Sequence, residues 1–163
     1  MILREPANAL DPRMRTYWTA EGLIATAVVG VLVAAGAVIA GLLGSTTAAW
    51  LVGGLGGLAT VVLGVLAVVT ARLDYRHFRY EVTDYGLYVA KGWLWRRHQV
   101  VPHARVQTVD TKSGPLMRAF GLVAVEVTTA SASGGTEIPG LAPPVANDLV
   151  EELARRAELE EGT

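Results

Sequence analysis

The chain has 163 residues, a formal net charge of −1 and no cysteine. Its length fits one domain with an appendage, and its near-neutral charge excludes the strongly basic surface of a general nucleic-acid binder. The lack of thiols excludes disulfides, cysteine nucleophiles and thiolate metal sites.

Charged residues are distributed very unevenly along the chain. Residues 22–71 contain no Asp, Glu, Lys or Arg. They hold two apolar runs, 23–43 and 48–70, and at about 1.5 Å of rise per residue each run spans the roughly 30 Å hydrocarbon layer. The polar link 44–47 suits a turn outside the lipid. The sequence therefore predicts a transmembrane hairpin over 22–71, between a leader at 1–21 and a domain at 72–163.

Two other interpretations of the apolar region fit less well. A buried soluble hairpin needs a larger protein shell than 163 residues supply. A cleaved signal peptide is suggested by the small residues at 47–49. However, the charged leader is long and a second apolar run follows at once, which is untypical of a signal sequence.

The Lys and Arg residues that flank the spans predict orientation. Three arginines precede the first span, three follow the second, and the turn has none. Because positively charged flanks stay in the cytoplasm, we expect both termini there, in a cell membrane crossed twice. These flanking residues are Arg4, Arg13, Arg15, Arg72, Arg76 and Arg79.

Glycines in the second span predict a packing surface. Gly53, Gly57 and Gly64 fall on one helical face, where small side chains let helices approach closely and form an oligomer. The alternative is that glycine is simply common in membrane helices. Neither span contains an ionisable residue, which argues against a proton or ion pathway.

The remaining chain alternates polar and apolar residues, the pattern of half-buried strands. We expect a short helical turn at 116–120, which begins beside Pro115 and ends before Gly121. The expected strands are 77–82, 87–91, 93–101, 105–111, 123–128 and 136–138.

The chain closes with a predicted amphipathic helix over 143–158. Val145, Leu149 and Leu153 recur every four residues along it, with Ala146, Val150 and Ala157 beside them, so it offers one apolar stripe to a sheet. Antiparallel strands followed by such a helix predict a small sandwich or open barrel, capped by the C-terminal helix.

Several segments in this order and spacing resemble the YdbS-like bacterial pleckstrin-homology (PH) domain membrane protein family. They are 79–87 (RYEVTDYGL), 92–97 (GWLWRR), 101–107 (VPHARVQ), 114–122 (GPLMRAFGL) and 138–141 (IPGL). The leader and the two spans also resemble membrane-anchored members of this family. The resemblance implies a strongly bent antiparallel sheet closed by a C-terminal helix.

The first inter-strand loop does not match the phosphoinositide site of many eukaryotic PH domains. That site uses basic residues, whereas residues 83–86 hold an acidic residue and neither Lys nor Arg. The resemblance therefore concerns the fold and not that ligand site.

No catalytic, cofactor or metal site is expected. His77, His98 and His103 lack metal-ligand spacing. Ser113 could join His103 and Asp110 in a triad, but no nucleophile elbow surrounds it. The sequence predicts a non-enzymatic protein.

Basic residues concentrate in the first half of the C-terminal domain. Residues 72–118 carry nine Lys or Arg against four Asp or Glu, whereas residues 119–163 carry two against eight. Basic side chains near a span are attracted to anionic headgroups. Trp93 and Trp95 interleave with this group, either in contact with lipid or a partner, or in the core of a solvated hairpin. The candidate lipid-facing residues are Arg72, Arg76, Arg79, Lys91, Arg96 and Arg97.

Three hypotheses follow for function. The first is a membrane-anchored interaction or scaffold module that recruits protein partners, either itself or a related PH-like membrane protein, in envelope-related assembly. The second is a sensor of anionic lipid headgroups in envelope stress. The third, a small oligomeric transporter or channel, is disfavoured by the uncharged spans. Membrane lipids are partners in all three, and nucleic acid in none.

Overall fold

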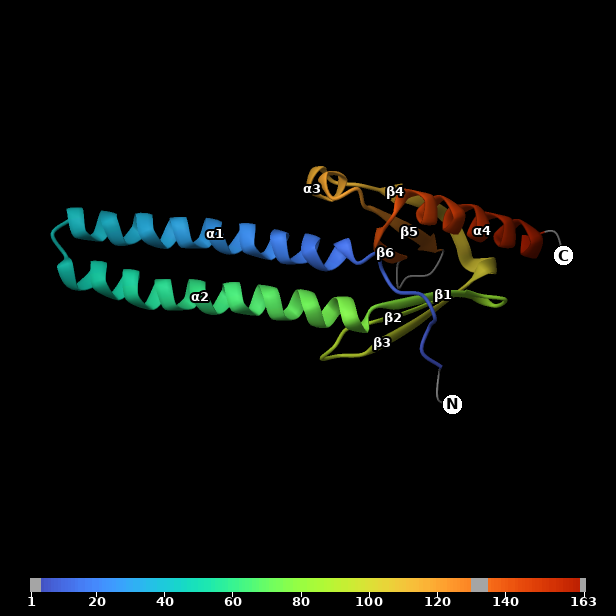
Figure 1. Cartoon of the computed structure of the whole chain (residues 1–163), viewed down its shortest axis with the longest axis horizontal. Coiled ribbons are helices and arrows are strands. Elements are labelled where there is room, and N and C mark those ends of the chain that lie inside the picture. Colours follow the sequence, from blue (N-terminus) through green and yellow to red (C-terminus); the bar gives the residue numbers. More distant parts are fainter. Residues whose placement is uncertain (1–3, 130–134, 162–163) are drawn as a thin grey trace. The chain divides into compact units, whose positions relative to one another are not determined.

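The computed structural model describes residues 4–129 and 135–161, which form two compact units (Figure 1). One unit is helical and covers Trp18–Leu73. The other contains the strands, and it combines residues up to Tyr17 with those from Asp74 onward. Residues that the sequence placed in a separate leader thus belong to the same unit as the C-terminal domain.

Two long helices form the hairpin. Helix α1 spans Arg13–Leu42 and helix α2 spans Thr46–His77, and both are long and apolar enough to cross a membrane. Most of their large apolar side chains are exposed, as expected of helices that face lipid. The helices extend beyond the apolar runs into charged segments, so the strand expected from His77 is wrong at its start. Leu43 lies just outside α1.

Six strands form two antiparallel sheets of three, which do not close into a barrel. The first sheet has the order β1 (Arg79–Thr83), β2 (Gly86–Lys91), β3 (Arg97–Pro102). The second has the order β4 (Val106–Lys112), β5 (Val123–Thr129), β6 (Thr136–Leu141). The short helix η1 (His103–Arg105) connects β3 of the first sheet to β4 of the second, and α3 (Pro115–Ala119) connects the paired strands β4 and β5.

Strand β3 begins four residues later than the sequence predicted. Gly92 has φ +90°, and a Cβ there would lie 2.3 Å from the carbonyl oxygen of Trp95. The chain therefore turns tightly after β2, and Trp93 and Trp95 lie in the loop instead of in the strand.

Helix α4 (Pro143–Glu161) packs on η1, β4 and β5 (Figure 1). Its residues Ala146, Leu149 and Leu153 are buried. The prediction that Val145 belongs to this stripe is wrong, because Val145 is 45% exposed. Ala146 takes its place, since spacings of three and four residues keep 146, 149 and 153 on one face.

The segment before α1 is built into the strand-containing unit. Asn8 and Tyr80 exchange two backbone hydrogen bonds of 3.0 Å, and Asp11 N donates to Gly140 O at 3.0 Å. Leu10 and Met14 are 2% and 1% exposed, so they are among the most buried residues of the chain. The leader is therefore a structural part of the domain.

The start of α1 is fixed by an aspartate before it. Asp11 Oδ1 accepts from the backbone N and Nε of Arg13, and Oδ2 accepts from Nη2. The guanidinium of Arg13 holds the pKa of the Asp11 carboxyl below its usual range. The same guanidinium donates through Nη1 to Phe120 O at 3.2 Å, which joins the helix start to the end of α3.

We expect Met14→Ala to lower the free energy of unfolding by about 2–5 kcal/mol, because it removes a fully buried side chain and leaves a cavity. The measurement is thermal unfolding of the full-length protein in detergent. Val145→Ala, at an exposed site, serves as the control and should change little. Equal effects of the two substitutions would contradict the docking of the leader.

Candidate functional site

A small basic pocket lies in the strand-containing unit. It has a volume of about 40 Å³ and is formed by the end of α2, the start of β1, the β2–β3 loop with its flanking strand ends, and the segment at Glu5 and Pro6. Five cationic side chains line it, and all five were candidates from the sequence: Arg76, Arg79, Lys91, Arg96 and Arg97. The sixth candidate, Arg72, belongs to the helical unit and does not line the pocket.

Strand register places two cations of the pocket directly opposite each other. Arg79 pairs with Ala90, and Ala90 pairs with His98, so these three residues form one row across the sheet. In the next row Lys91 lies directly opposite Arg97. Like charges directly opposite each other in an antiparallel pair are destabilising. A nearby anion would therefore stabilise this strand pair.

One carboxylate lies at the pocket. Glu5 Oε1 accepts from Arg96 Nη1 at 3.1 Å, although both side chains are more than half exposed. Arg79 Nη1 donates to Phe78 O at 2.8 Å. Within the described ranges, no ion pair joins Lys91 or Arg97 to a carboxylate. Sequence patterns did not identify Glu5, because its contact with Arg96 spans 91 residues.

The β2–β3 loop exposes three large apolar side chains beside the pocket. Trp93, Leu94 and Trp95 are 40%, 66% and 84% exposed. The alternative that these tryptophans fill the core is wrong. Behind the loop, His98 stacks on Tyr88 with ring centroids 6.0 Å apart, and its Nδ1 lies 2.9 Å from the Tyr88 hydroxyl.

The three candidate glycines of the second span have different surroundings. A Cβ at Gly53 would contact Ala37 Cβ at 3.6 Å, and one at Gly64 would contact Thr26 Cγ2 at 3.5 Å, both on α1. A Cβ at Gly57 would meet no atom within 4 Å. Gly53 and Gly64 therefore support packing inside the hairpin, and Gly57 faces open space.

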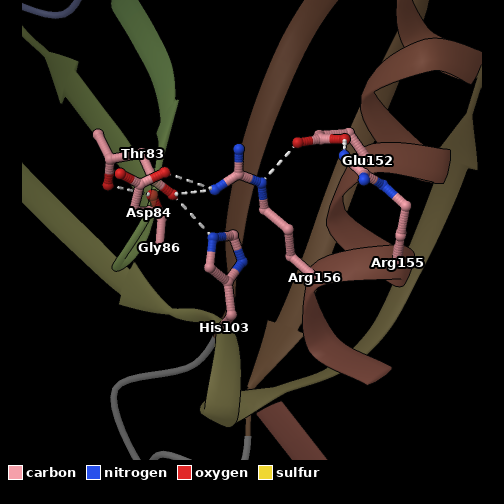
Figure 2. A network of polar contacts seen from close by, with 7 residues as sticks. All are labelled: Thr83, Asp84, Gly86, His103, Glu152, Arg155 and Arg156. Carbon is pink, nitrogen blue, oxygen red and sulfur yellow. Dashed lines mark hydrogen bonds and ion pairs between the residues drawn. The ribbon is translucent and has the colours of Figure 1, made fainter. Parts of the chain in front are cut away.

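The β1–β2 turn is held by a network from α4 (Figure 2). Arg156 Nη1 donates to Thr83 O at 3.1 Å and to Asp84 Oδ1 at 3.2 Å, and its Nε donates to Glu152. His103, which is 2% exposed, donates from Nε2 to the same Thr83 carbonyl at 2.9 Å. The bonds from Arg156 thus join the β1–β2 turn to helix α4.

This network leaves the first inter-strand loop without an uncommitted cation. The guanidinium groups of Arg155 and then Arg156 hold the pKa of Glu152 below its usual range, so Glu152 stays ionised and paired. Arg156 bonds to the carboxylates of both Asp84 and Glu152 (Figure 2), so its charge is already paired. The sequence did not identify Arg156, whose contact with the turn spans more than 70 residues.

Two members of the triad that the sequence allowed, Ser113 and His103, bond to different backbone carbonyls. Ser113 Oγ donates to Leu122 O at 3.0 Å, whereas His103 bonds to Thr83 O. Over residues 4–129 and 135–161, no group of three His, Asp or Glu side chains could hold a metal ion.

Comparison with known proteins identifies the class. The family model described as "Bacterial PH domain" matches residues 22–157, so the chain belongs to the bacterial PH domain family. The match covers most of α1, all of α2 and the strands, and most of α4. The two sheets and the terminal helix are the PH-type domain that the sequence motifs indicated.

The chain is also similar to a particular relative, "UPF0699 transmembrane protein YdbS" of Bacillus subtilis (strain 168). The two are 28% identical over 165 residues, which covers 95% of each chain. No solved structure matches the chain significantly. This protein is a YdbS-like bacterial PH membrane protein with two transmembrane helices. Its family does not correspond to a known class of enzyme.

We expect Arg156→Gln to lower the free energy of unfolding, because it breaks charge-assisted bonds that join α4 to the β1–β2 turn. Asp84→Asn should change it by less than about 0.5 kcal/mol, since the Asp84 side chain is 97% exposed. Chemical denaturation of the full-length protein in detergent checks both. A larger loss of stability in Asp84→Asn than in Arg156→Gln would contradict the assignment of Arg156 as the residue that joins α4 to the turn.

Proposed function

We propose that this protein is a non-enzymatic, membrane-anchored interaction module that holds its PH domain at the cytoplasmic face of the cell membrane. Its partners would be membrane proteins in envelope assembly, either a second copy of itself or a related PH-like protein. The observation that carries the proposal is the shared burial of the segments before and after the hairpin in one compact unit.

The shared unit supports an even number of membrane crossings. Leu10 precedes α1, Met14 lies in the first turn of α1 and Phe78 follows α2, and all three are buried in the same unit. Two segments that pack on one domain must lie on the same side of a bilayer. The arginines that flank both spans, together with the uncharged turn, favour the cytoplasm as that side.

Edge strand β3 supports a protein-binding role. It pairs with β2 on one side only, so the described part of the chain leaves its other backbone edge available to a partner strand. The exposed Trp93 and Trp95 lie in the loop just before it, and exposed aromatic side chains are enriched at interfaces.

We expect the purified full-length protein to form an oligomer, or to retain a second membrane protein, in mild detergent. If self-association uses the open space beside Gly57, Gly57→Leu should shift it toward monomer, because the larger side chain blocks close helix approach. Ala59→Leu adds similar bulk on another exposed face and is the control. Light scattering coupled to size-exclusion chromatography measures the mass. A strictly monomeric particle with no co-purifying membrane protein would count against the module.

A second candidate function, binding of anionic lipid headgroups, is favoured by the basic pocket. Five of the six candidate cations surround one cavity, and the exposed Trp93, Leu94 and Trp95 lie beside it. Tryptophan prefers the membrane–water interface, and each basic side chain near an anionic surface is attracted by about 1 kcal/mol.

For this candidate we expect a blue shift of tryptophan emission when one third of the nanodisc lipid is anionic instead of zwitterionic. The protein would carry Trp18→Phe and Trp50→Phe, so that only Trp93 and Trp95 report. High salt should reverse the shift. Lys91→Gln with Arg97→Gln should abolish it, and Arg105→Gln with Arg118→Gln should not. A shift that ignores both lipid charge and salt would dispose of this candidate.

A further inference from the structure

The cations of the basic pocket are arranged at an energetic cost that an anion would relieve. Lys91 and Arg97 are directly opposed across the strand pair, and Arg96 precedes Arg97 in the chain. The nearest bonded carboxylate, that of Glu5, contacts only Arg96. The opposed pair therefore keeps its repulsion in this state of the molecule.

The size of the pocket indicates what kind of anion it can take. A volume of 40 Å³ accommodates about three oxygen-sized groups, since one water needs roughly 10–15 Å³. A phosphate monoester presents three unsubstituted oxygens, and arginine binds such groups in a bidentate manner.

Glu5 is held beside the pocket by its neighbours in the leader. Ala7 N donates to Glu81 Oε2 at 3.1 Å, and Arg4 pairs with the same carboxylate at 3.4 Å. Pro6 is buried, so this short segment has a fixed place against β1. The Glu5 side chain itself is 67% exposed and bonds to one arginine, which makes it easy to displace.

We propose that the pocket is a binding site for a phosphate monoester, which displaces the carboxylate of Glu5 from Arg96 when it binds. The proposal deepens the lipid-headgroup candidate and rests on it. Glu5 is an internal competitor: its ion pair with Arg96 must break before phosphate can bind this arginine, which lowers the apparent affinity for phosphate. The phosphate then lies between Arg96 and the opposed Lys91 and Arg97.

The same chemistry can come from a lipid or from solution. Phosphatidic acid carries a phosphate monoester on a lipid, and inorganic phosphate carries a comparable group in water. The exposed Trp93, Leu94 and Trp95 beside the pocket would add contact with acyl chains in the first case only.

The test is calorimetric titration of the full-length protein in non-ionic micelles. The ligands are inorganic phosphate and short-chain phosphatidic acid, with short-chain phosphatidylcholine as the ligand without a monoester. Glu5→Gln should tighten phosphate binding about two- to five-fold, the range of an exposed ion pair. Glu151→Gln removes an exposed charge elsewhere and should leave the affinity unchanged.

Arg96→Gln should weaken binding at least about ten-fold, since it removes a charged donor, and Arg118→Gln should not. Tighter binding of phosphatidic acid than of inorganic phosphate would support the site and identify a lipid ligand. Equal binding would support the site and identify a free phosphate.

Two outcomes would overturn the proposal. One is equal affinity of Glu5→Gln and the unsubstituted protein, and the other is equal binding of phosphatidylcholine and phosphatidic acid. If the nanodisc emission shift persists while Glu5→Gln has no effect, lipid attraction stands and the competition by Glu5 fails. If neither appears, both fail.

Discussion

The burial of Leu10 and Met14 is the interaction on which the rest of this structure depends. It attaches the chain ahead of the first helix to a domain made almost entirely from the chain behind the second. Gly140 makes the contact possible: its φ is +67°, and any Cβ there would lie 2.3 Å from Met14 Sδ. Without this docking, the domain would hang from the hairpin by a single connection, and Glu5 would have no fixed place beside the basic pocket.

Much of the fold could be predicted from local patterns. The uncharged stretch over residues 22–71 predicted the hairpin, and alternation predicted each strand to within a few residues. The main error, the start of β3, arose because Trp93 and Trp95 continue the alternating pattern while Gly92 turns the backbone. Val145 was misassigned because a period of four matches the helix only approximately.

The candidate site was partly visible in the sequence. Its cations formed a basic region next to the second span, so charge counting found them. Their convergence depends on strand register, which brings Lys91 opposite Arg97 and cannot be read from composition. Glu5 was missed at the pocket, and Arg156 at the β1–β2 turn, because each makes its contact across a long separation in sequence.

The bridge between Asn8 and Tyr80 has a consequence for biosynthesis. The leader is synthesised first, and its docking partners Tyr80 and Gly140 are synthesised only after both helices. The contacts of the leader with them can therefore form only once both helices have been made. The domain can be completed only when the segments before and after the hairpin lie on the same side of the membrane. A chain inserted with a single crossing could therefore not form the complete domain.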